Sequence, residues 1–177
     1  MVGRGQGGGG RLSRLVEADA IESEPLRQVI RWYRGLPPSG RWPPVTAFRP
    51  EDLPPTALPH IGRVDVELAP FRVFYRALGT AICQSIGQDV SRQYLDELDF
   101  PQKADLEQWF RTAVAAPGPL FVRFPQTVDG DSFIYEGMGL PFGACADDPR
   151  AFLIAEDFLH TSTWRASVRH RRYDPLE

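Results

Sequence analysis

The stretch Ile61–Leu98, which reads IGRVDVELAPFRVFYRALGTAICQSIGQDVSRQYLDEL, decides the fold. Ile61–Leu68 alternates between apolar and charged side chains, which is the period of two of a half-buried strand. Ala69-Pro70 interrupts the alternation, because proline has no N–H for a sheet ladder. Phe71–Leu78 is rich in aromatic and β-branched residues, which favours a second strand. So short a link between two strands predicts an antiparallel hairpin.

Short helical segments are expected after the hairpin. The hydroxyl of Thr80 is placed to cap a helix, and Gly87 can take the left-handed conformation that ends one. Asp89 or Ser91 can then cap a further helical turn that runs to Leu98. Helical spacing is strongest farther along, where one apolar stripe is made by Leu106, Trp109, Phe110, Ala113 and Val114.

The chain before Ile61 predicts a helix and a proline-rich wrap. A weak helix is expected over Leu12–Ala20, and a firmer one after Ser23, which can cap it with Pro25 in the first turn. Gly35–His60 holds eight prolines, so it is expected to wrap the domain with one or two short turns, for example at Glu51–Leu53. The apolar stripe of the firmer helix is offered as its contact with the sheet or a second subunit: Leu26, Val29, Ile30 and Tyr33.

Three more strands are predicted downstream, at Leu120–Phe124, Phe133–Phe142 and Ala151–Phe158, with Asp129-Gly130 as a hairpin turn. The order of elements predicts an α+β fold: a five-stranded antiparallel sheet with helices on one face. The domains expected are a flexible glycine-rich tail (1–22), a helix with the proline-rich wrap (23–60), a core domain (61–160) and a basic tail (161–177).

Composition limits the class of protein. A length of 177 residues suits one domain. A net charge of −3 with interspersed acids and bases implies no broad basic surface, so a nucleic-acid partner is not expected. No apolar run reaches the roughly 18 residues of a membrane helix, and no signal peptide is evident, so a soluble cytoplasmic protein without a membrane partner is expected. The two cysteines form no CxxC pair, and no metal-ligand or nucleotide-binding motif is present.

The motifs VDVELAPFRVFYRALGT and GQDVSRQYLDEL together resemble the stand-alone PAS proteins of bacteria. The proline-rich approach RPEDLPPTALPHIGRVDV and the strand YEGMGLPF resemble the same family, so the likeness runs from about Glu24 to Phe158. Ser91-Arg92 stands where the family pattern has Thr-Gly. The resemblance implies a PAS-like sheet with helices over one face, and a leading helix on the outer face of the sheet or on a second subunit.

Glu136 is the first candidate site residue. It shares a strand face with apolar side chains, so its carboxylate must be paired or pay a desolvation cost. One interpretation is a ligand-binding acid in the cavity between sheet and helices. The other, which we favour, is a structural salt bridge to Arg76 or Arg123.

Arg76 is expected to point inward and to pair with Asp89 or Glu136, either as a brace or as a clamp for an anionic ligand. Tyr75, Met138 and Trp109 complete the residues proposed to line a ligand site. Gly137 and Gly139 share the other strand face and are expected to receive the Leu26–Tyr33 helix. No catalytic or metal-binding residue is predicted, and no cofactor, although an unknown small ligand can be accommodated.

The function expected from these observations is that of a PAS-type sensory or regulatory domain. It would bind a small ligand or a protein partner and signal in trans to another protein, as a homodimer. The alternatives are a ligand-free protein–protein adaptor and, ranked last, a small enzyme that uses Glu136 with Tyr75 or Tyr135 as acid and base.

Overall fold

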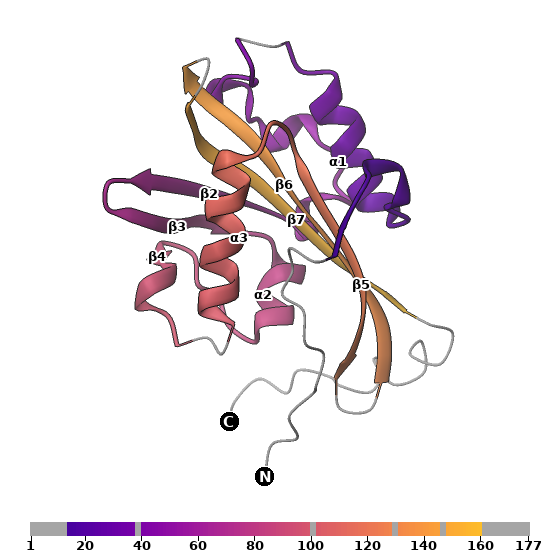
Figure 1. Ribbon diagram of the computed structural model, residues 1–177. Coiled ribbons are helices and arrows are strands. Elements are labelled where there is room, and N and C mark those ends of the chain that lie inside the picture. The colour runs from indigo at the N-terminus through magenta and orange to yellow at the C-terminus, as the bar shows by residue number, and fades with distance from the viewer. Residues whose placement is uncertain (1–13, 38–39, 100–101, 129–130, 146–147, 161–177) are drawn as a thin grey trace.

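The computed structural model describes residues 14–37, 40–99, 102–128, 131–145 and 148–160. It is an α+β fold with a seven-stranded antiparallel sheet and three α-helices (Figure 1). The strands are β1 (Leu15–Val16), β2 (Ile61–Leu68), β3 (Phe71–Leu78), β4 (Gln93–Tyr94), β5 (Leu120–Val128), β6 (Asp131–Cys145) and β7 (Asp148–His160). The helices are α1 (Glu24–Arg34), α2 (Thr80–Ile86) and α3 (Lys103–Ala115).

All five predicted strands lie in one sheet, whose order is β1-β5-β6-β7-β2-β3-β4. The prediction missed the strands β1 and β4, which are two residues each and pair with the outer edges of β5 and β3. Two residues are too few to produce a detectable alternation, so only the tertiary pairing reveals them.

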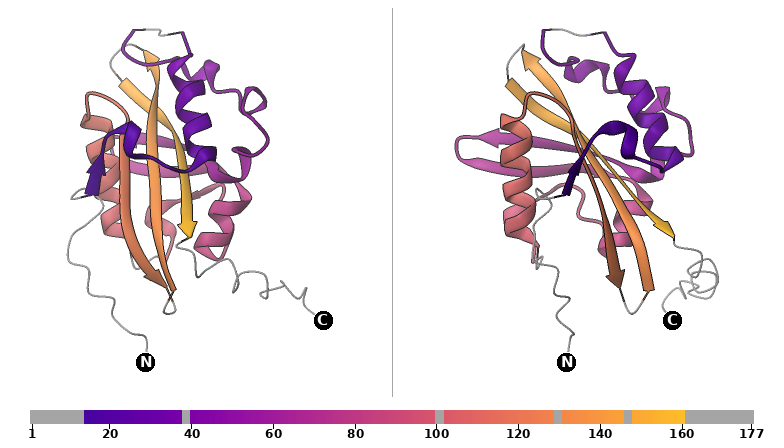
Figure 2. Two further views of the ribbon diagram at one scale, coloured as in Figure 1. Left: turned by 90° about the vertical axis from the view of Figure 1, so that its right-hand side faces the viewer. Right: turned by 45° about the vertical axis from the view of Figure 1, so that its right-hand side comes forward.

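Helices cover both faces of this sheet, because the N-terminal helix, which was expected in addition to the helices on one face, packs on the other face (Figure 2). α3 and α1 lie on opposite sides of β5, β6 and β7 (Figure 2). We call these sides the α3 face and the α1 face. The leading helix packs on the outer face, as the resemblance implies, and leaves the α3 face to α2 and α3.

Each face has its own hydrophobic core. On the α1 face, Leu26, Val29 and Ile30 of α1 are buried with the even-numbered residues Met138 and Leu140 of β6. On the α3 face, the main buried group is formed by Val64, Val66, Val73, Tyr75, Val90, Leu95, Leu98, Trp109, Phe110, Ala113 and Phe152. The two cores follow from the alternation of side chains along strands that are apolar on both sides.

The start of α1 is formed as predicted. Ser23 is its N-cap, with Oγ accepting from the backbone N–H of Leu26 at 3.3 Å, and Pro25 lies in the first turn. The helix expected before it is wrong within the described residues, where Leu15–Val16 is a strand and Ala18–Ala20 is a 3-10 turn. Pairing with β5 overrides the weak helical pattern there.

The segment after the hairpin needs two corrections. Thr80 is the first residue of α2 rather than its cap; the N-cap is Gly79, whereas Gly87 ends the helix with φ 85° as predicted. Asp89 does not cap a helix either. Its carboxylate accepts from the N–H of Ser91 at 2.9 Å, and the chain then forms β4 and a 3-10 turn at Leu95–Glu97.

The proline-rich wrap contains three 3-10 turns among its described residues, at Val45–Ala47, Pro50–Asp52 and Leu58–His60. The second overlaps the turn predicted at Glu51–Leu53. No helix in the described part of the chain has the length and apolar character needed to cross a bilayer.

Candidate functional site

The residues proposed for one ligand site lie in three different places. Glu136 and Met138 belong to the α1 face, because they alternate along β6 with residues that face α3. Tyr75 and Trp109 are buried on the α3 face. Arg76 and Asp89 are exposed and lie in neither core. These side chains therefore do not form a single site.

Glu136 is fully buried, with 0% of its surface exposed, beneath the segment that leads into α1. Its Oε1 and Oε2 each lie 3.0 Å from the backbone N–H of Glu22, and Oε2 accepts from the N–H of Ser23 at 2.9 Å. Arg123 Nε lies 3.0 Å from Oε1, an ion-pair distance at which the N–H direction does not meet hydrogen-bond geometry. A second nitrogen of Arg123 contacts Glu22 at 2.8 Å.

A second carboxylate supports the same helix start. Asp157 pairs directly with Glu136 across the β6–β7 ladder, and its Oδ2 accepts from the Ser23 hydroxyl at 2.7 Å. His60 Nδ1 lies 3.4 Å from Asp157 Oδ1. Carboxylates at a helix N-terminus interact favourably with its free N–H groups and its dipole. The favoured interpretation of Glu136, a structural ion pair with Arg123, is therefore confirmed. The other interpretation placed this carboxylate in a ligand cavity between the sheet and the helices, but it lies on the α1 face, beneath the start of α1.

The apolar stripe of α1 contacts the sheet of its own chain. Leu26, Val29 and Ile30 are buried against it, and the Tyr33 hydroxyl donates to the carbonyl of Pro141 at 2.6 Å. Burial raises the pKa of Tyr33 well above its usual value, so the phenol stays protonated and keeps this bond. The predicted contact between helix and sheet is confirmed on Met138, Leu140 and Phe142, not on Gly137 and Gly139.

Arg76 does not form the internal brace that was predicted. Its side chain is 53% exposed, and its Nε donates to Asp65, a residue on the neighbouring strand that also pairs with Arg63. Tyr75 is buried in the core of the α3 face, so strand alternation turns the next residue, Arg76, to the opposite face. A register shift between Arg63 and Val64 then lets Leu78, but not Arg76, pack against that core. Exposed ion pairs of this kind contribute little to stability.

Gly139 is where Trp109 of α3 approaches the sheet. A methyl group on Gly139 would lie 2.2 Å from the Trp109 ring, so only glycine allows this contact. Trp109 Nε1 is buried, and no described residue accepts a hydrogen bond from it. An unsatisfied buried donor is uncommon in folded proteins.

The α3 face also carries a polar cluster that the sequence analysis missed. Glu156 of β7 accepts from the Tyr135 hydroxyl at 2.9 Å and from the Ser85 hydroxyl of α2 at 2.6 Å. Tyr135 lies along the sheet over Gly137, where a methyl group would meet its hydroxyl at 2.7 Å. Strand alternation could have predicted that Glu156 and Tyr135 share a face. The sequence spacing gives no sign that Ser85 of α2 donates to Glu156.

An aromatic row adjoins this cluster. Phe124, Tyr135 and Phe158 pair directly across β5, β6 and β7. Their ring centroids are 4.9 Å apart for the first two and 5.2 Å for the last two. Phe133 packs against Phe158 beside it, with centroids 5.1 Å apart.

Other reactive groups are not assembled into a site. Within the described ranges, no three His, Cys, Asp or Glu side chains come together as metal ligands would. Burial, with the nearby Asp89 carboxylate, raises the pKa of the Cys83 thiol, which makes it a poor nucleophile. Glu136 cannot act together with Tyr75 or Tyr135, since it lies on the opposite face of the sheet from both.

Comparisons with known proteins give no identification. No protein-family model matches the chain, and no curated protein matches it.

Proposed function

We propose that this chain is a PAS-type sensory or regulatory domain that binds a small ligand on the α3 face. The observation that carries the proposal is that five long antiparallel strands form one sheet, with the segment between the second and third of them folded over one face. This is the arrangement that the sequence motifs imply. Signalling in trans, as a homodimer, is part of the proposal.

The turn at Arg92 gives further support. The family pattern has glycine at this position, and Arg92 adopts φ 65°, in the left-handed region that favours glycine. Its N–H donates to the carbonyl of Tyr75 at 2.6 Å, which ties the turn to β3. The local conformation is thus the one expected of the family even though the residue differs.

Native mass spectrometry of the protein purified from its own host tests the proposal. We expect the chain to carry an additional small mass that is lost on denaturation, and the same spectrum to report a dimer. A spectrum with the bare chain mass alone, from protein kept in mild buffer throughout, would contradict ligand binding.

A ligand-free adaptor is the second candidate. It is favoured by the close packing of Trp109 against Gly139 and of Phe110 against Phe152, whose rings are 6.3 Å apart. Large side chains there occupy room that a ligand would need. In that case the bare chain would be recovered together with a protein partner, and alteration of the α3-face residues would not change partner binding.

A further inference from the structure

We propose that Glu156, the Tyr135 hydroxyl and the aromatic row Phe124–Tyr135–Phe158 form a subsite for an organic ammonium group. The ligand class is a protonated amine with an apolar body. This inference rests on the proposed function, because it names the kind of ligand that the α3 face would take. We call these residues the ammonium subsite.

The first argument is the charge of Glu156. Within the described part of the chain, no cationic side chain pairs with its carboxylate, whose two hydrogen bonds come from neutral hydroxyl groups. His60 Nδ1 lies 3.1 Å from the backbone carbonyl of Glu156, not from its carboxylate. The Ser85 hydroxyl has a single proton and a second acceptor, the carbonyl of Ile82 at 2.8 Å. Each carboxylate oxygen can accept a further hydrogen bond, so a partly exposed negative charge on this face is open to an external donor.

The second argument is the neighbouring aromatic surface. Aromatic faces attract cations electrostatically, and clusters of such rings are used to recognise ammonium groups. The row already attracts one cation of the chain: the guanidinium carbon of Arg14 lies 4.6 Å from the centre of the Phe124 ring. Phe124 and Phe158 are both only partly buried, so their surfaces are within reach of a ligand.

The third argument is the pairing of rows in the sheet. Val122, Gly137 and Glu156 are aligned across β5, β6 and β7, and the aromatic row lies two residues farther along the same face. Because Gly137 has no side chain, the Tyr135 phenol lies over it and reaches the Glu156 carboxylate, so the negative charge and the aromatic row are adjacent.

Other ligand classes fit this arrangement less well. A single carboxylate with two hydroxyl groups does not provide the ligand set of a metal ion. An anion would be repelled by Glu156. A neutral apolar molecule would leave the carboxylate without compensation and would gain nothing from its charge.

The test is isothermal titration calorimetry with 2-phenylethylammonium chloride, and with 2-phenylethanol as its neutral match, on the full chain at neutral pH. We expect saturable binding of the ammonium compound and at least roughly tenfold weaker binding of the alcohol, since hydrogen bonds to charged groups are the stronger ones. Glu156→Gln should weaken binding of the amine by at least about tenfold. Equal binding of the two compounds, or no saturation in the millimolar range, would overturn the proposal.

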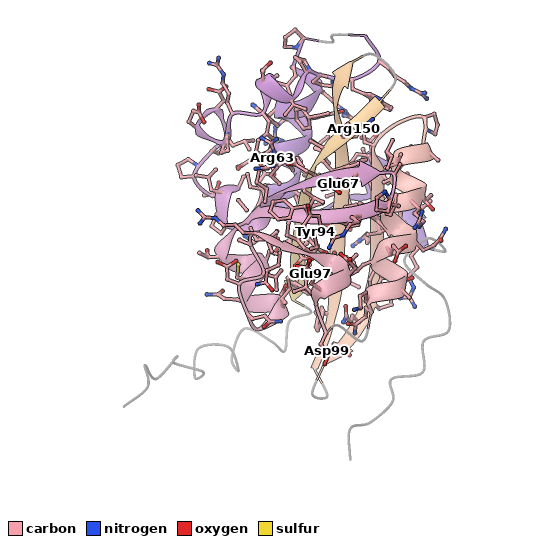
Figure 3. All side chains as sticks on the ribbon, turned by 90° about the vertical axis from the view of Figure 1, so that its left-hand side faces the viewer. Arg63, Glu67, Tyr94, Glu97, Asp99 and Arg150 are labelled. Carbon is pink, nitrogen blue, oxygen red and sulfur yellow. The ribbon has the colours of Figure 1, made fainter. Side chains whose placement is uncertain are left out.

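Glu67→Gln is the matched control. Glu67 also accepts from a tyrosine, Tyr94, at 2.7 Å, but it lies on the side of β2, β3 and β4 shown in Figure 3. There Arg72 already lies over the Tyr94 ring at 3.6 Å. This variant should bind the amine as the unaltered chain does, and an equal loss in both variants would mean that overall charge, not the ammonium subsite, governs binding.

Two-dimensional NMR of the unaltered chain locates the bound amine without the use of a variant. The amine should shift the amide resonances of Tyr135, Glu156 and Phe158, and shifts confined to other residues would overturn the proposal. The result is separable from the proposed function. If native mass spectrometry finds an anionic or neutral molecule on the chain, the sensory proposal stands and the ammonium subsite is wrong.

Discussion

Glu136 and Glu156 lie in adjacent rows of the same three strands but on opposite faces of the sheet. Glu136 is aligned with Arg123 and Asp157 and is covered by the start of α1, which supplies backbone N–H groups to its carboxylate. Glu156 is aligned with Val122 and Gly137, and among the described residues its carboxylate accepts from two hydroxyl groups and pairs with no cation. The difference teaches that a buried carboxylate whose charge is compensated by its own chain stabilises the fold. The carboxylate that pairs with no described cation is the one that we propose for ligand binding.

The largest effect is expected from Glu136→Gln. Glutamine has one acceptor oxygen in place of two and no charge, so N–H groups of the Glu22–Ser23 segment and the Arg123 guanidinium would lose compensation. We expect the free energy of unfolding to fall by about 3 kcal/mol. Thermal melting should show a decrease of roughly 10 °C for a chain of this size.

Glu67→Gln, at an exposed acid of the same sheet, serves as the control for this melting experiment. It should leave the melting temperature nearly unchanged, since exposed polar substitutions have small effects. An equal loss of stability in both variants would contradict the special structural role assigned to the buried carboxylate of Glu136.

Gly139→Ala is expected to have the next largest effect. The added methyl group would lie 2.2 Å from Trp109, so α3 must move, at a cost of about 2 kcal/mol in urea unfolding. Gly118→Ala is the matched control, because a methyl group there meets no atom within 4 Å. Similar midpoints for the two variants would mean that Trp109 does not need the close approach to the sheet.

Two serines allow the acids to be compared through their partners. Ser23 donates to Asp157 and caps α1, whereas Ser85 donates to Glu156. Ser23→Ala should lower the free energy of unfolding by about 1.5 kcal/mol, because it removes a helix cap and a buried hydrogen bond. Ser85→Ala should cost less than about 1 kcal/mol. Urea titration of both variants checks the order, and the reverse order would contradict the assigned roles.

The smallest change in stability is expected for Glu156→Gln. Glutamine keeps an acceptor for the hydroxyl groups and removes a charge that no cation of the described chain neutralises, so the free energy of unfolding should change by less than about 0.5 kcal/mol. Chemical denaturation measures it directly. A loss as large as that of Glu136→Gln would show that Glu156 is a structural acid as well.

Local patterns predicted most of the individual elements. The alternation in Ile61–Leu68, the aromatic strand Phe71–Leu78 and the apolar stripe of α1 all correspond to elements of the structure. The apolar strand face that Glu136 shares was also predicted, because side chains alternate along any strand. Arg123 was one of the two cations proposed for Glu136.

Features that depend on a second segment were not predicted. The core lies on the Val73–Tyr75 face of β3, which leaves Arg76 outside, and the β1–β5 pairing replaced the expected helix. Gly137 and Gly139 were predicted to share a face and to receive α1, but the helix on that face is α3. Sequence spacing gives no information on which of two helices occupies a given face when both faces are apolar.

The sequence by itself determined where strands and helices form and which side chains share a face, since these follow from local periodicity. Only the tertiary structure decided which acid is neutralised. Glu136 receives Arg123 and the start of α1, and Glu156 receives hydroxyl groups from β6 and α2, because segments distant in sequence supply each environment. Charge compensation is a property of three-dimensional proximity, which no single stretch of this chain encodes.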